Sequence, residues 1–133
     1  MLDELCYYTL SHPDPGFIHQ HVVDAYTAQT ADDSSKPIAV TFALIGLYLY
    51  VEKGFTGKQV QHRHVQLAKR KQEWLKLPVP AQRGAITVRE VLAIPAGTGR
   101  DEMIREWCVS VWDSWNQSRP KIVALVERLL AIR

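Results

Sequence analysis

Hydrophobic side chains recur at helical spacing along most of the chain, and short polar or proline-containing stretches separate the periodic segments. The clearest pattern lies near the C-terminus, where apolar residues follow one another at steps of three and one, as on one face of a helix. These residues are Ile104, Trp107, Cys108, Val111, Trp112 and Trp115. The same spacing returns from Ile122 to Leu129. The pattern therefore predicts two amphipathic helices in the C-terminal part of the chain.

A different pattern marks the segment 38–51, which is apolar at every position except Thr41. A helix that is apolar on all sides is buried on all sides. This segment is also too short to cross a bilayer, because a crossing needs roughly 20 apolar residues. We therefore predict the central helix of a bundle here, and no membrane partner.

Prolines limit the helices of the N-terminal part. A first helix over 2–10 ends before Pro13 and Pro15, because a proline has no amide donor and disfavours helix at the residue before it. A second helix follows over 17–31, with apolar residues gathered on one face. The segment 2–31 is thus predicted to form two helices joined by a sharp corner.

Capping residues mark the starts of two further helices. Thr56 precedes a basic helix predicted over 57–74, and Thr87 precedes a short helix over 88–93. Glu90 stands three residues after Thr87, the spacing at which the two side chains each accept a hydrogen bond from the other's amide. Both threonines are therefore predicted as N-caps.

These elements predict an all-α protein, a compact bundle of about six helices around the central apolar helix 38–51. The length of 133 residues favours a single helical domain over 1–133. Apolar residues make up 47% and charged residues 23%, values typical of soluble globular proteins, so wholesale disorder is excluded.

Charge and cysteine content limit the classes of binding partner and indicate a cellular compartment. The net charge of +2 is small for a dedicated nucleic-acid binder, and the basic segment 57–74 lacks interleaved aromatic residues. A simpler expectation is that this segment complements acidic helices of the same chain or of a second copy, in a homodimer. With two cysteines and no positively charged, apolar leader after Met1, we expect a cytoplasmic protein.

Histidines are the strongest candidates for metal binding. His19 with His21 and His62 with His64 form two pairs at i and i+2, which point about 200° apart on a helix, so neither pair alone can hold one metal ion. His21 and Asp24 stand at i and i+3, where two side chains can share a ligand. A site for a divalent metal would therefore combine His19 or His21 with Asp24 and His64.

A structural role is the more frequent one for such residues. A histidine on an apolar helix face usually donates its ring N–H to a backbone carbonyl, which suits His19 and His64. The helical wheel of 17–31 places Asp24 on the polar side, where a carboxylate is solvated or paired. Gln29 falls on the apolar face, and we expect it to cap the helix or to lie at the boundary with solvent.

Several short strings carry a resemblance that covers most of the chain. They are Cys6-Tyr7-Tyr8, His19 with Val23-Asp24-Ala25-Tyr26 and Gln29, Leu47-Tyr48-Leu49 leading to Glu52-Lys53-Gly54, Gly84-Ala85-Ile86-Thr87-Val88, and Trp107 through Ser110-Val111-Trp112 to Trp115. In this order they resemble an uncharacterised bacterial family, the domain-of-unknown-function family numbered 5946. Longer relatives look as if they carry an N-terminal cysteine pair suited to zinc, which this chain lacks, so the resemblance implies no zinc ribbon here.

The resemblance implies no activity, but it implies a shared pocket. It brings His19, Asp24 and Tyr26 together with the tryptophan segment, including Trp107 and Trp112, as candidate ligand-binding residues. We therefore predict a protein of unknown function with a pocket for a small ligand or a metal between the second helix and the tryptophan-rich helix. The alternatives are a protein-interaction or scaffold domain that forms homo-oligomers, and a nucleic-acid accessory protein that uses the basic segment. No substrate class follows from these residues, and whether the protein is an enzyme stays open.

Overall fold

The computed structural model describes residues 1–133 and contains helices, turns and one long extended segment, but no strand. The predicted all-α class is confirmed. The α-helices are α1 (Leu2–Leu10), α2 (Pro15–Thr30), α3 (Pro37–Lys53), α4 (Gly57–Ala68), α5 (Val88–Ala93), α6 (Thr98–Ser114) and α7 (Arg119–Leu130). A short 3-10 turn, η1 (Asn116–Ser118), leads from α6 into α7.

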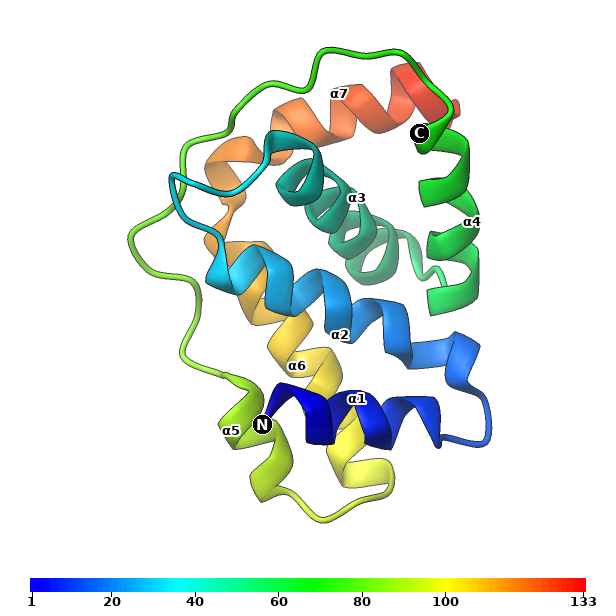
Figure 1. Cartoon of the computed structure of the whole chain (residues 1–133), viewed down its shortest axis with the longest axis vertical. Helices are drawn as coiled ribbons and strands as arrows, with labels where there is room; N and C mark the ends of the chain where they lie inside the picture. Colours follow the sequence, from blue (N-terminus) through cyan, green and yellow to red (C-terminus); the bar gives the residue numbers. More distant parts are fainter.

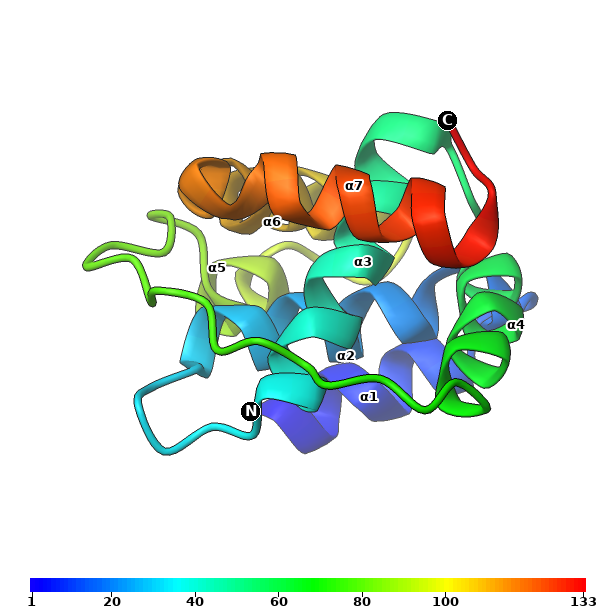
Figure 2. The same ribbon diagram turned by 90° about the horizontal axis from the view of Figure 1, so that it is seen from above.

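Helix α3 lies at the centre of the molecule, and α2, α4, α6 and α7 surround it (Figures 1 and 2). Every residue from 43 to 49 is buried, so the middle of α3 meets other helices on all sides, as its apolar sequence predicts. Helices α1 and α5 lie together at the end of the molecule that is remote from α7 (Figure 1). None of the helices combines the length and the apolar character that a membrane crossing requires.

The apolar core draws on every α-helix, and the tryptophans of α6 are among its largest members. Trp107 and Trp115 are fully buried, and Trp112 is 3% exposed. Trp112 packs against Tyr48 of α3 and donates its indole N–H to the carboxylate of Glu52 over 2.7 Å. The tryptophan stripe therefore joins α6 to the central helix by both apolar and polar contacts.

Local capping explains where α4 and α5 begin. The hydroxyl of Thr56 accepts the amide of Gln59, and the side chain of Gln59 accepts the amide of Thr56 over 2.8 Å. Thr87 and Glu90 form the same reciprocal pair at the start of α5. Both predicted N-caps are confirmed, because each depends only on residues three positions apart.

The predicted helix over 57–74 is wrong beyond Ala68, where α4 ends. From Lys69 to Thr87 the chain forms no helix and runs around the outside of the bundle (Figure 1). Tertiary contacts hold this course: the Arg70 guanidinium donates to the carbonyl of Leu129 at the end of α7, and Trp74 packs edge-on against Phe42 of α3. A continuing helix would carry both side chains away from these partners.

The far end of the extended segment is held by Gln29, a role that the sequence did not suggest. The amide of Gln29 donates to the carbonyls of Arg83 and Ile86, at 3.1 and 2.7 Å, and its oxygen accepts the indole N–H of Trp107 at 3.0 Å. Capping is therefore wrong for Gln29, whereas its half-buried side chain fits the other expectation, a position at the boundary with solvent. From there its amide ties three parts of the chain together.

We expect Trp112→Ala to lower the free energy of unfolding by about 3–5 kcal/mol, because it removes a large buried side chain and a donor to Glu52. Urea denaturation followed by circular dichroism measures this. The matched control is Val65→Ala at a position 55% exposed, which should change stability by less than about 0.5 kcal/mol. An unchanged unfolding curve for Trp112→Ala would contradict the placement of Trp112 in the core.

Candidate functional site

Helix α2 buries two polar side chains in the core of the bundle. His21 is 1% exposed and Asp24 is 3% exposed. The placement of Asp24 on a solvated face is therefore wrong. The reason is that α2 packs against four helices, α1, α3, α4 and α6. A helical wheel assumes one buried and one solvated face, and α2 has no wide solvated face.

His21 is held by an aromatic stack rather than by hydrogen bonds of its ring. Its imidazole lies parallel to the ring of Tyr50 with the centroids 3.5 Å apart, and neither ring nitrogen has a hydrogen-bond partner. Burial lowers the pKa of His21 to about 3, and the nearby Arg105 acts in the same direction. The ring is therefore neutral in the folded protein at physiological pH.

Asp24 lies directly against the backbone of α3 at Gly46. A side chain at position 46 would overlap with the Asp24 carboxyl group, so only glycine leaves room for it. Gln20 donates to one carboxyl oxygen over 2.9 Å, while the other oxygen is buried without a partner. Burial raises the pKa of Asp24 well above its usual range, which favours the protonated form.

His19 and His64 each join their helix to a neighbour. The ring of His19 is hydrogen-bonded to the hydroxyl of Thr9 in α1 at 2.9 Å, and His64 donates to the carbonyl of Phe42 in α3 at 2.8 Å. Burial lowers the pKa of both histidines. Both histidines therefore make structural hydrogen bonds, the role that the sequence analysis gives as the more frequent one for such residues.

The structure does not gather the metal candidates His19, His21, Asp24 and His64 around one point. No group of three or more His, Cys, Asp or Glu side chains is placed so that it could hold a metal ion. The divalent-metal site stays a prediction.

The candidate ligand-binding residues on α2 and α6 also contact different parts of the protein. Trp107 donates to Gln29 and Trp112 donates to Glu52, so both indole N–H groups are already bonded within the protein. Tyr26 is half-buried on α2 and borders a surface depression near Gln29. The shared pocket that the family resemblance implies also stays a prediction.

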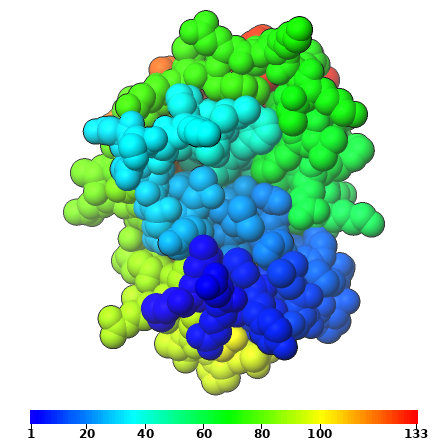
Figure 3. Space-filling model, in the orientation of Figure 1, coloured from blue at the N-terminus to red at the C-terminus, as the bar shows by residue number.

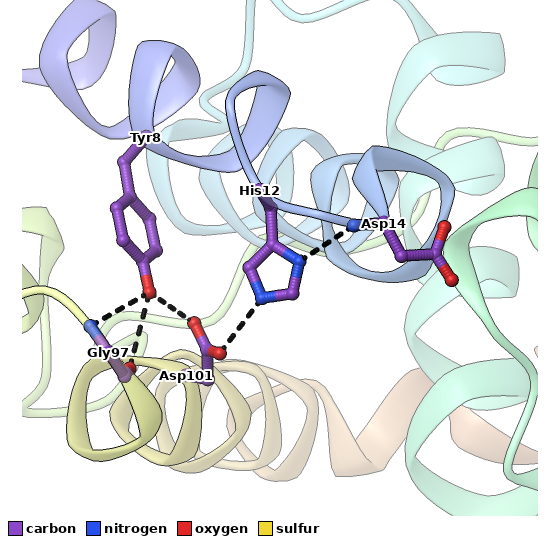
Figure 4. Close-up of polar contacts among 5 residues, drawn as sticks. All are labelled: Tyr8, His12, Asp14, Gly97 and Asp101. Carbon is purple, nitrogen blue, oxygen red and sulfur yellow. Dashed lines mark hydrogen bonds and ion pairs between the residues drawn. The ribbon is translucent and has the colours of Figure 1, made fainter.

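Sequence considerations missed a polar network between α1 and α6, which Figure 4 shows. Tyr8 and His12 both bond to the carboxylate of Asp101, at 2.5 and 3.0 Å, and Tyr8 also bonds to the backbone of Gly97. The other nitrogen of His12 accepts the amide of Asp14, which leaves the proton on Nε2 to be donated to Asp101. Both nitrogens of His12 are therefore engaged, and the network fixes α1 on the first turn of α6.

An apolar cavity of about 240 Å³ lies at the opposite end of the molecule, between the start of α3, the segment 72–77 and α7. Two of its lining residues, Thr41 and Leu77, are buried, and Trp74 also lines it. Figure 3 shows the extended segment, in green, beside the cyan start of α3 on the outer surface of this end. Concave apolar sites with a few polar groups are where proteins usually bind small molecules.

Sequence reasoning missed this cavity because its walls come from segments far apart in the chain. In the sequence Thr41 stands out only as the polar exception in the central helix, and the predicted helix over 57–74 includes residues 72–74. A signal was nevertheless present in Trp74, an aromatic residue in a basic, proline-flanked stretch.

Comparison with known proteins gives one match. A family model described as a family of unknown function, DUF5946, matches residues 1–116, which extend from α1 to the start of η1. No curated protein and no solved structure matches the chain. Helix α7 lies beyond the matched residues.

We expect Gly46→Ala to destabilise the protein by several kcal/mol, on the order of an overpacked core substitution, although alanine is the better helix former. The reason is the overlap of the new side chain with the carboxyl group of Asp24. In the double variant Gly46→Ala with Asp24→Ala, most of this loss should return. Chemical denaturation of the single and double variants measures the coupling, and additive effects would contradict the contact.

We expect His21 to make the protein less stable as the pH falls from about 6.5 toward 3. In this range the unfolded chain takes up a proton that the folded protein, with the pKa of His21 lowered to about 3, does not bind. Asp24 acts in the opposite sense, because its raised pKa keeps a proton on the folded protein that the unfolded chain loses. The variant His21→Phe preserves an aromatic stack but removes the first effect.

The stability of wild type relative to His21→Phe should therefore fall by about 1.4 kcal/mol per pH unit between pH 6 and pH 4. Urea unfolding at several pH values gives this slope. His62→Phe, at an exposed position, serves as the control and should follow the wild type. Parallel pH profiles for wild type and His21→Phe would show that His21 is not buried in its neutral form.

Proposed function

The chain belongs to the family of unknown function DUF5946, and we propose that it is a small-molecule-binding protein whose ligand is compact and mostly apolar. The observation that carries this proposal is the apolar cavity between α3, the segment 72–77 and α7. Removing apolar ligand surface from water in such a cavity supplies the main driving force for binding.

The size of the cavity limits the ligand. A volume of about 240 Å³ lies below the roughly 300–1,000 Å³ of pockets that hold drug-sized molecules. It suits one aromatic ring with a short side chain. The ring of Trp74 supports an aromatic ligand, because aromatic pairs gain attraction beyond the area that they bury.

The other polar groups of the structure are less suited to binding a ligand. Tyr8, His12 and Asp101 satisfy one another, and two cations of the extended segment are bonded to backbone carbonyls: Arg70 to Leu129 and Lys76 to Asp33. At the border of the cavity, in contrast, Lys121 and Arg128 form no ion pair. Because α7 supplies one of its walls and lies beyond residues 1–116, we assign the site to this chain and not to the family as a whole.

We expect 3-phenylpropionate or 3-phenylpropan-1-ol to bind with a dissociation constant in the range of about 10 μM to 1 mM, as ligands of this size allow. Isothermal titration calorimetry measures the affinity. The variant Ala124→Phe fills the mouth of the cavity from α7 and should abolish binding.

The matched control is Ala68→Phe, an exposed alanine on α4 that does not line the cavity and should leave binding unchanged. Thermal denaturation shows whether both variants fold. Absence of binding of both compounds to the wild type at millimolar concentration would overturn the proposed function. Equal binding by Ala124→Phe and wild type would place the ligand elsewhere.

A further inference from the structure

The wall that α7 contributes to the cavity carries a cation at each end. Lys121, Ala124, Leu125 and Arg128 follow the spacing i, i+3, i+4, i+7 and so lie on one face of the helix. The rise of a helix places the backbone of Lys121 and Arg128 about 10 Å apart. Both cations are exposed, and neither forms an ion pair. Two free cations thus border an apolar surface.

The opposite wall carries Glu73, the one carboxylate that lines the cavity. The lining therefore holds two cations against one anion, a local excess of positive charge. Arg128 has the planar guanidinium that binds a carboxylate through two parallel hydrogen bonds. The charges at the mouth accordingly favour an anionic group, and a carboxylate fits the geometry of Arg128.

The inner end of the cavity holds a different polar group. Thr41 is 1% exposed and lines the cavity, and its hydroxyl is not among the buried polar atoms that are shut off from solvent without a partner. A hydroxyl group that borders a cavity can both donate a hydrogen bond to a bound molecule and accept one from it. A polar atom of the ligand would provide such a partner.

We propose that the ligand is a small aromatic hydroxy acid, with its carboxylate at the mouth on Arg128, its negative charge also attracted by Lys121, and its hydroxyl at the inner end on Thr41. This inference rests on the proposed function and specifies the ligand class for the same cavity. The ring lies between the two polar ends, beside Trp74 and the Ala124–Leu125 wall. Such a ligand places one polar group at each end of the cavity, where the protein presents a polar side chain.

The test compares four probes that share one skeleton: 3-(4-hydroxyphenyl)propionate, 3-phenylpropionate, 3-phenylpropan-1-ol and 3-phenylpropylamine. Isothermal titration calorimetry on the full chain should give affinities in this order, with the acids about 3- to 10-fold tighter than the alcohol. Raising the salt concentration should weaken binding of the acids and leave the alcohol unchanged.

Variants at the mouth separate charge from shape. Arg128→Gln and Lys121→Gln should each weaken the acids about 3- to 10-fold and leave the alcohol unchanged. Glu73→Gln should act in the opposite direction and strengthen the acids. These side chains are exposed, so that the substitutions leave the core intact.

Variants at the inner end test the hydroxyl. Thr41→Val should remove the preference for the hydroxyphenyl acid over the phenyl acid, whereas Thr41→Ser should retain it. Unfolding midpoints of both variants show whether the fold is preserved, and the affinity of the phenyl acid provides an internal reference.

Equal affinity of acid, alcohol and amine, unchanged by Arg128→Gln, would overturn this inference and leave the proposed function standing. Loss of the acid preference only in Thr41→Val, with no effect of the cations, would also overturn it. If none of the four probes binds to the wild type, both the inference and the proposed function fail.

Discussion

The carboxyl group of Asp24 lies against the backbone of α3 at Gly46, and this contact sets how closely α2 approaches the central helix. A second close approach occurs where α4 begins, because a side chain at Gly57 would meet the backbone of Gly16 and Phe17. Two glycines thus let α3 and α4 pack on α2 with little space between backbones. The remaining helices are arranged around this unit, with α6 covering the other side of α2 and α3.

Close packing at this point also explains why burial favours the neutral forms of His21 and Asp24. Asp24 is 3% exposed, one of its carboxyl oxygens is buried without a partner, and the ring of His21 is covered by Tyr50. Charge would be costly in such surroundings, and the directions of the two pKa shifts reflect that cost. Cys108 belongs to the same region: its thiol donates to the carbonyl of His21, and burial raises the pKa of the thiol. The polar groups at the centre of the bundle are therefore shielded from solvent and favour their uncharged forms. Lys121 and Arg128, which border the cavity, are in contrast exposed.

The sequence predicted features that depend on neighbouring residues. The caps at Thr56 and Thr87 and the buried centre of α3 follow from spacings of a few residues, and the structure confirms them. The burial of Asp24 and the clamp formed by Gln29 could not be predicted, because both depend on partners in other helices or in the extended segment. The cavity could not be predicted for the same reason. Its lining residues become neighbours only when α7 and the segment 72–77 pack beside the start of α3, and no pattern of nearby residues indicates that contact.

The extended segment from Lys69 to Thr87 contains residues that hold it on the helices and residues that only line the cavity. Its course is fixed by polar contacts of Arg70, Lys76, Arg83 and Gln29. Apolar contacts hold it as well, because Leu77 is part of the core and Trp74, Val79 and Ile86 pack against the core. Substitutions at residues 72, 73 and 75 therefore alter one wall of the cavity without disturbing helix packing. Such a wall allows the shape and charge of the cavity to change while the helix packing that supports it stays the same.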